Sequence, residues 1–126
     1  MKWGLIPMKI FISQPMNGKT DEEVMKRRDE IKKYCIKVFQ KPCDFIDSFT
    51  KPEELVSKGR IAMLGHSITM MHDAELVVFD KGWDKARGCC VERLVCSEYK
   101  IPVYDMDNPN ARIHKVLVDD DVLFWR

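Results

Sequence analysis

The sequence feature that most limits how this chain can fold is the run ELVVFD at residues 75–80. A continuous apolar run closed by an acid is typical of a strand buried on both faces, because a strand with one solvated face alternates apolar and polar residues. Strands of this kind occur in parallel sheets, and helices cover both faces of such sheets. The run therefore predicts an α/β protein.

Strand-like and helix-like segments alternate along the rest of the chain. KIFIS at residues 9–13 predicts a strand that ends in turn residues, and Thr20 followed by acids at 21–23 predicts a helix start. Pro42 ends that helix. Further elements are predicted as a strand at 43–46, a helix with Ile61, Leu64, Ile68 and Met71 on one apolar face, a helix from Gly88 and a strand at 101–104. This alternation favours an open, mostly parallel sheet with helices on both faces.

Length and charge limit the domain count and the partners. The 126 residues fit one domain, and we expect residues 1–126 to form it, with residues 1–7 as a disordered extension ahead of a second methionine, Met8. A formal net charge of +1 lacks the basic excess that nucleic-acid-binding proteins usually carry. No apolar run approaches the roughly 18 residues of a membrane span, and MKWGLIPMKIFI is too short and interrupted for a signal peptide. We therefore expect neither a nucleic-acid partner nor a membrane partner.

The five cysteines favour a cytoplasmic location. They are odd in number, form no CxxC pair, and include the adjacent Cys89 and Cys90. We expect reduced, partly buried thiols, which is the state that cytosolic conditions maintain. The three histidines have no metal-ligand spacing, so neither a metal nor another cofactor is expected.

Three segments are expected to meet at one edge of the sheet. In open parallel sheets the ligand lies outside the carboxyl ends of the strands, near a switch in strand order. Residues 13–19 follow the first predicted strand, residues 80–87 follow ELVVFD, and a helix then starts at Gly88. The binding site is therefore predicted where these segments converge.

Glu92 is the first candidate catalytic residue, because it lies near the start of the helix that follows the 80–87 loop. A helix N-terminus stabilises an ionised carboxylate, which suits a nucleophile that attacks an anomeric carbon. The alternative is that acids are simply favoured in first turns.

The loop DKGWDKARG supplies the next candidates. Asp80 and Asp84 are candidate proton donors to a leaving base, and Trp83 is a candidate for stacking on that base. Lys85 and Arg87 could hold a phosphate. The alternative is a solvated, charged loop with a tryptophan lid.

SQPMNGKT at residues 13–20 is one residue away from a phosphate-binding Walker A loop, with Ser13 where the first glycine belongs. We do not favour that interpretation, because Pro15 removes a backbone N–H from the loop and the chain is short for a nucleoside triphosphatase.

IFISQPMNG and SITMMHDAELVVFDKGWDKARGCCVERLVCSEYKIPVY together resemble the nucleoside 2-deoxyribosyltransferase-like superfamily, and in particular its small bacterial and phage branch, over about residues 9–105. The resemblance implies a flavodoxin-like, three-layer α/β/α fold. It also implies a glutamate nucleophile, Glu92, that attacks C1′ of the sugar and expels the base, after which another base or water takes the sugar. The substrate-binding residues that it implies are Ser13, Gln14, Pro15, Met16, Asn17, Gly18, Trp83, Arg87 and Gly88.

The chain departs from the superfamily pattern at two positions. Phe11 stands where many members have a tyrosine that hydrogen-bonds the nucleophile, and Ala86 stands where they have Asp or Ser. The alternative hypothesis is therefore a non-catalytic nucleotide-binding protein of the same fold. The resemblance also implies a homo-oligomer, for which VLFWR at residues 122–126 offers an apolar contact segment.

Overall fold

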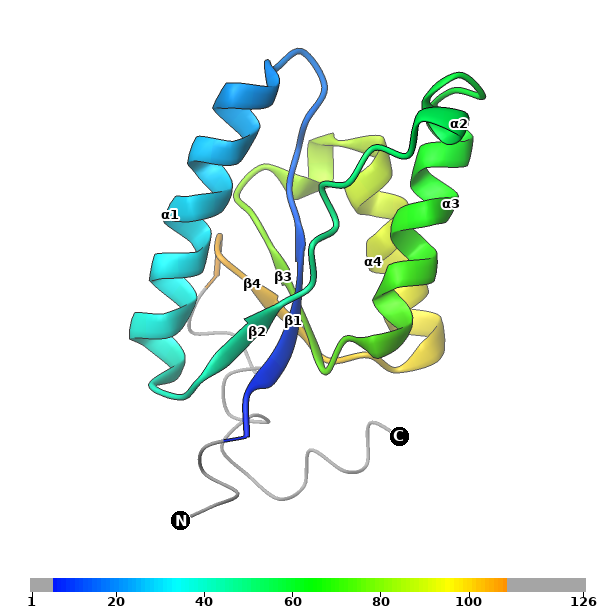
Figure 1. Cartoon of the computed structure of the whole chain (residues 1–126). Coiled ribbons are helices and arrows are strands. Elements are labelled where there is room, and N and C mark those ends of the chain that lie inside the picture. The colour runs from blue at the N-terminus through cyan, green and yellow to red at the C-terminus, as the bar shows by residue number, and fades with distance from the viewer. Residues whose placement is uncertain (1–5, 109–126) are drawn as a thin grey trace.

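The computed structural model describes residues 6–108 of the chain, and a four-stranded, all-parallel sheet forms its centre (Figure 1). The strands are β1 (Met8–Ser13), β2 (Cys43–Phe45), β3 (Leu76–Phe79) and β4 (Val103–Asp105), in the spatial order β2-β1-β3-β4. The predicted α/β fold is confirmed. The strand order is that of the first four strands of a flavodoxin-like sheet.

Helices cover both faces of the sheet, so the fold has three layers (Figure 1). One face is covered by α1 (Asp21–Phe39), and the other by α3 (Arg60–Met70) and α4 (Arg87–Tyr99). The short helix α2 (Glu53–Val56) precedes α3, and the 3₁₀ turns η2 (Met71–Asp73) and η3 (Trp83–Lys85) flank β3. Within residues 6–108, no helix is long and apolar enough to cross a membrane.

The strand β3 is buried over its whole length, as its apolar run predicts. Its alternate side chains enter two separate cores. On the α1 side lie Ile10, Ile12, Ile31, Cys35, Leu76, Val78, Tyr104 and Met106; on the α3 and α4 side lie Phe11, Met71, Val77, Phe79 and Cys96. The two cores fix which way each residue at the end of β1 and β3 points, because side chains alternate along a strand.

The helix α1 begins where the sequence predicts. Thr20 is its N-cap, accepting a hydrogen bond from the Glu23 N–H, while the Glu23 side chain accepts from the Thr20 N–H. The buried stripe of α1 consists of Val24, Arg28, Ile31 and Cys35. One member of that stripe, Arg28, is a charged residue, which is unusual on the buried face of a helix.

The apolar face predicted for 61–71 is only partly correct. Met71 is buried, but it lies in η2, and no residue of α3 itself is fully buried. Ile61, in the first turn of α3, is 87% exposed. Residues 1–5 of the predicted extension and the apolar segment 122–126 lie outside the described residues.

Candidate active site

The three segments predicted to converge meet at the carboxyl ends of β1 and β3. These strands are neighbours, and the chain leaves β1 toward α1 on one face and β3 toward α4 on the other. The Asp80 N–H donates a hydrogen bond of 2.9 Å to the Ser13 carbonyl, which joins the two loops where they begin. This is the switch in strand order at which open α/β sheets bind ligands.

Glu92 lies in the second turn of α4 and its side chain turns in toward the end of β1. The residue is only 7% exposed. The Ser13 hydroxyl donates a hydrogen bond of 2.6 Å to Glu92 Oε1, across 79 residues of sequence. Glu92 therefore lies beside the start of the 13–18 loop, as predicted from the strand–loop–helix pattern.

Burial dominates the electrostatics of Glu92. It raises the pKa of the carboxyl from 4.5 to about 7, although the hydrogen bond from Ser13 and the positive charge of Arg28 act in the opposite direction. Position near a helix start alone favours an ionised carboxylate, and here the loss of solvent outweighs that effect. A carboxyl group that changes charge near neutral pH is typical of functional sites.

Cys89 lies next to the same hydroxyl. It is buried, and burial raises the pKa of its thiol to about 12, so the reactive thiolate is rare at neutral pH. All five cysteines are free thiols, of which Cys35, Cys89 and Cys96 are buried.

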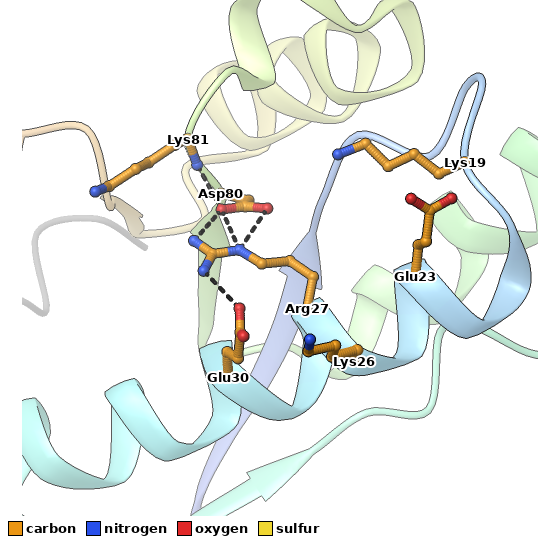
Figure 2. A pocket seen from close by; sticks show the side chains of 7 residues that line it. All are labelled: Lys19, Glu23, Lys26, Arg27, Glu30, Asp80 and Lys81. Carbon is orange, nitrogen blue, oxygen red and sulfur yellow. Dashed lines mark hydrogen bonds and ion pairs between the residues drawn. The ribbon is translucent and has the colours of Figure 1, made fainter.

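Asp80 has a different environment from the one that its predicted proton-donor role requires. It is 5% exposed, and Arg27 donates to both of its oxygens at 2.7 to 3.2 Å (Figure 2). The Lys81 N–H donates a further hydrogen bond of 2.7 Å. These donors occupy the carboxylate and connect the end of β3 to α1. The structure therefore favours a structural ion pair over proton donation by Asp80.

The tryptophan and aspartate of η3 are not arranged as a free lid. Trp83 is half-buried, with its ring 5.3 Å from Phe79 and with the Arg93 guanidinium 4.6 Å over it. Arg93 also makes two hydrogen bonds to Asp105. Asp84 is exposed, as are Lys85 and Arg87. Arg93 therefore occupies one face of the Trp83 ring.

The 13–18 loop becomes more exposed along its length. Gln14 is buried and donates to the Val24 carbonyl at 3.2 Å, Pro15 is half-buried, and Met16, Asn17 and Gly18 are exposed. The Walker A interpretation gains no support, because the Thr20 hydroxyl caps α1 and acids fill the first turn of that helix. Negative charge at that position repels a phosphate.

Gly88, which the resemblance implies as a substrate-binding residue, packs toward α3. A Cβ at Gly88 would lie 3.9 Å from Leu64 Cδ1, so this position brings α4 close to α3 rather than facing the 13–18 loop.

Sequence analysis missed Arg28. It is 2% exposed, and none of its guanidinium nitrogens has a hydrogen-bond partner among the described residues. Burial lowers its pKa, while the charges of Asp47 and Glu92 act to raise it. The buried Ser48 hydroxyl and the Gln14 side-chain oxygen also lack partners there. The sequence does contain a signal: Arg28 falls between Val24 and Ile31 on the apolar stripe of α1.

An open groove of about 560 Å³ lies on the α1 side of the Asp80 ion pair (Figure 2). It is lined by Lys19, Glu23, Lys26, Arg27, Glu30, Asp80 and Lys81. Glu92 does not line this groove, because its side chain lies on the α4 side, where Ser13 points. The pocket predicted around the Glu92 carboxylate is therefore not this groove. Its charges nearly balance, and Arg27 is already paired with Glu30 and Asp80.

No group of three or more His, Cys, Asp or Glu side chains between residues 6 and 108 is arranged to hold a metal ion. Among known proteins, the chain matches no family model, no curated protein and no solved structure. The fold and the side-chain geometry therefore define an α/β protein with a buried carboxyl group at the switch in strand order.

Proposed function

We propose that this protein cleaves the N-glycosidic bond of a nucleoside or nucleotide, or transfers the sugar to another base, with Glu92 as the nucleophile. The observation that carries the proposal is the buried Glu92 carboxyl, which accepts a hydrogen bond from a neutral hydroxyl at the carboxyl edge of a parallel sheet. The motif resemblance supplies the reaction class. No cofactor is required for this chemistry.

The proposed reaction has two displacement steps. In the first, a Glu92 oxygen forms a bond to C1′ of the sugar, the C1′–N bond breaks, and its electron pair leaves with the base, which takes up a proton. In the second, water or another base attacks C1′ and releases the Glu92 carboxylate. The first step requires ionised Glu92, so activity should rise with pH through about 7.

Ser13 supplies the hydroxyl that the resemblance leads us to expect at Phe11. Phe11 is buried in the core on the α3 and α4 side, and Ser13 lies two residues along the same strand on the same face. Its hydroxyl donates to Glu92 at 2.6 Å. We assign Ser13 as a positioning residue, because it acts on the substrate through Glu92.

The alternative function is nucleotide binding without turnover. Two observations favour it: Ala86 carries no proton donor, and Asp80 is occupied by Arg27. In the enzyme hypothesis the remaining candidate donor to the base is Asp84, which is exposed and free to approach a ligand.

Incubating the full chain with a panel of nucleosides and nucleoside monophosphates, and separating products by chromatography, tests the proposal. The enzyme hypothesis predicts free base from at least one compound, and loss of that release in Glu92→Gln. Saturable binding with no base released from any compound would establish the alternative.

We further propose that the protein acts in the cytoplasm as a homo-oligomer. The free thiols support the compartment. The exposed apolar side chains of Ile61 and Leu94, which are 87% and 61% exposed, support a contact between copies. Light scattering at micromolar concentration should give a multiple of the chain mass, and a monomer mass would contradict the oligomer.

A further inference from the structure

We propose that Arg28 is the main contact residue of a phosphate subsite at the carboxyl ends of β1 and β2, and that the substrate is therefore a nucleoside monophosphate rather than a nucleoside. This inference rests on the proposed function and narrows its substrate class. Neither the sequence motifs nor the groove of Figure 2 includes Arg28.

The first argument is the unmet hydrogen-bonding capacity of Arg28. A guanidinium group carries five N–H donors in a planar fork and stays charged. Here the group is 2% exposed, and Nε, Nη1 and Nη2 all lack partners within residues 6–108. A buried, unpartnered charge is strongly unfavourable for folding unless something binds it.

The surroundings of the guanidinium also favour a ligand site. Its charge interacts with Glu92 on α4 and with Asp47, which follows the end of β2. The neighbour of Asp47 is Ser48, whose buried hydroxyl is also unpartnered. Arg28 lies on the buried face of α1, one turn after Val24, whose carbonyl accepts a hydrogen bond from Gln14 just beyond β1.

The third argument is the polarity of the free atoms. The unpartnered atoms on Arg28 and Ser48 can donate to an anion, and the free Gln14 oxygen can accept from a protonated phosphate oxygen or from a sugar hydroxyl. The Gln14 amide is held by the Val24 carbonyl, one turn before Arg28 on the same face of α1. An arginine fork matches a phosphate bidentately, so phosphate is the anion that this set of donors fits best.

Arg27 provides the internal contrast. It precedes Arg28 in α1, yet it is paired with both Asp80 and Glu30. The chain thus supplies carboxylate partners to the half-exposed arginine and none to the buried one. A purely structural role would call for the opposite arrangement.

Access to Arg28 is expected through the segment 46–52, which leads from β2 to α2. An exposed ion pair of 2.6 Å between Lys51 and Asp21 connects this segment to the start of α1. Exposed ion pairs of this kind stabilise a contact only weakly, so this pair adds little resistance to entry of a ligand between the segment and α1.

Calorimetric titration of the full chain with inorganic phosphate, with nucleoside monophosphates and with the matching nucleosides tests the subsite. Wild type should bind phosphate and bind each monophosphate more tightly than its nucleoside. Arg28→Gln should weaken phosphate and monophosphate binding by roughly 10- to 100-fold, as expected for loss of charge-assisted hydrogen bonds, and leave nucleoside binding unchanged. Arg28→Lys, which keeps the charge and loses the fork, should fall between the two.

Lys26→Gln is the matched control, because it removes a positive charge from the groove and leaves Arg28 in place. It should change phosphate affinity by less than about threefold. Loss of phosphate binding in Lys26→Gln but not in Arg28→Gln would move the anion to the groove and overturn the subsite. Phosphate binding that is absent in wild type would overturn it as well.

Ser48→Ala keeps the test decisive if Arg28→Gln does not fold. It should weaken phosphate binding several-fold, and an unchanged affinity would contradict the subsite. Failure of the inference and failure of the proposed function are distinguishable. If base is released from nucleosides and neither phosphate nor Arg28→Gln changes binding or base release, the proposed function stands and the subsite is refuted. If phosphate binding depends on Arg28 but no base is released, the subsite stands and the proposed function is refuted.

Discussion

Glu92 and Asp80 are buried carboxylates at the same end of the same sheet, and their surroundings differ sharply. Asp80 accepts hydrogen bonds from Arg27 on both oxygens and another from the Lys81 N–H. Glu92 accepts one, from the neutral Ser13 hydroxyl. The two residues are buried to a similar extent, Asp80 being 5% exposed and Glu92 7% exposed. Asp80 is nevertheless paired with an arginine, whereas the pKa of Glu92 is raised to about 7.

Charged partners, more than burial, therefore distinguish the two carboxylates at this edge. The arginines follow the same division. Arg27, whose pKa is raised by its bonds to Asp80, completes the structural pair, while burial lowers the pKa of the unpartnered Arg28, also on α1. The buried atoms that lack hydrogen-bond partners between residues 6 and 108 belong to Gln14, Arg28 and Ser48, and a ligand could satisfy them.

The largest expected effect is on catalysis by Glu92→Gln. The amide keeps the size of the side chain and removes the nucleophilic charge, so base release should fall by roughly three or more orders of magnitude. Steady-state release of base at pH 8 measures the effect. Glu98→Gln, at an exposed position of the same helix, is the matched control and should retain wild-type rates. Equal rates in Glu92→Gln and wild type would remove Glu92 from the chemistry.

The same substitution should increase stability above neutral pH. The folded-state pKa of Glu92, about 7, lies above its ordinary value of 4.5, so the folded protein holds this proton more tightly. The contribution of Glu92 to stability is therefore present below pH 4.5 and falls as pH rises to 7. Glu92→Gln should exceed wild type in unfolding free energy by on the order of 3 kcal/mol at pH 8 and by little at pH 4.5. Urea unfolding at both values measures the difference.

That result would depart from what position in sequence alone predicts. An acid near a helix start leads one to expect a small loss of stability in Glu92→Gln, of about 0.3–1 kcal/mol. A loss at pH 8 would show that the helix terminus, and not burial, dominates at this carboxyl.

Asp80→Asn should have the opposite sign. It removes the charge that Arg27 and the Lys81 N–H bind, and it leaves Arg27 with weaker partners, so we expect a loss of about 1.5–3 kcal/mol in unfolding free energy. Asp73→Asn, at an exposed position before β3, is the control and should change stability little. If Asp80→Asn were as stable as wild type but unable to release base, Asp80 would belong to the catalytic group after all.

Ser13→Ala should produce the smallest effect of the series. Loss of the hydroxyl removes a bond that lowers the pKa of Glu92, so the midpoint of the pH–rate profile should move above 7 and kcat/KM at pH 7 should fall by about tenfold. Ser13→Thr, which keeps a hydroxyl, should restore the profile. An unchanged midpoint in Ser13→Ala would contradict the positioning role.

Much of the fold could be predicted from local sequence pattern. ELVVFD predicts the buried β3 because a double-sided strand needs a continuous apolar run, and Thr20 with Glu23 predicts the start of α1 because both side chains bond to the adjacent backbone. These signals depend on residues close together in the chain. The exposure of Ile61 could not be predicted in this way, because it depends on how α3 packs in the folded protein.

In the candidate site too, features that depend on nearby residues could be predicted and features that depend on distant residues could not. The placement of Glu92 beside the loop after β1 follows from the topology of parallel sheets, which strand order fixes in general terms. The bond between Asp80 and Arg27 joins residues 53 apart and the bond between Ser13 and Glu92 joins residues 79 apart, so neither leaves a local signal. The consequence is that two carboxylates equally plausible in sequence take different roles in the structure.

The most direct measurement is to trap and map the covalent intermediate. A nucleoside or nucleotide analogue with fluorine at C2′ should slow breakdown of the sugar ester, because electron withdrawal destabilises its oxocarbenium-like transition state. Intact mass should then rise by the mass of the sugar portion, and peptide mapping should place the addition on Glu92 in wild type, with no addition in Glu92→Gln. Addition on Asp80 or Asp84, or base release from the analogue with no covalent adduct at any residue, would contradict the account.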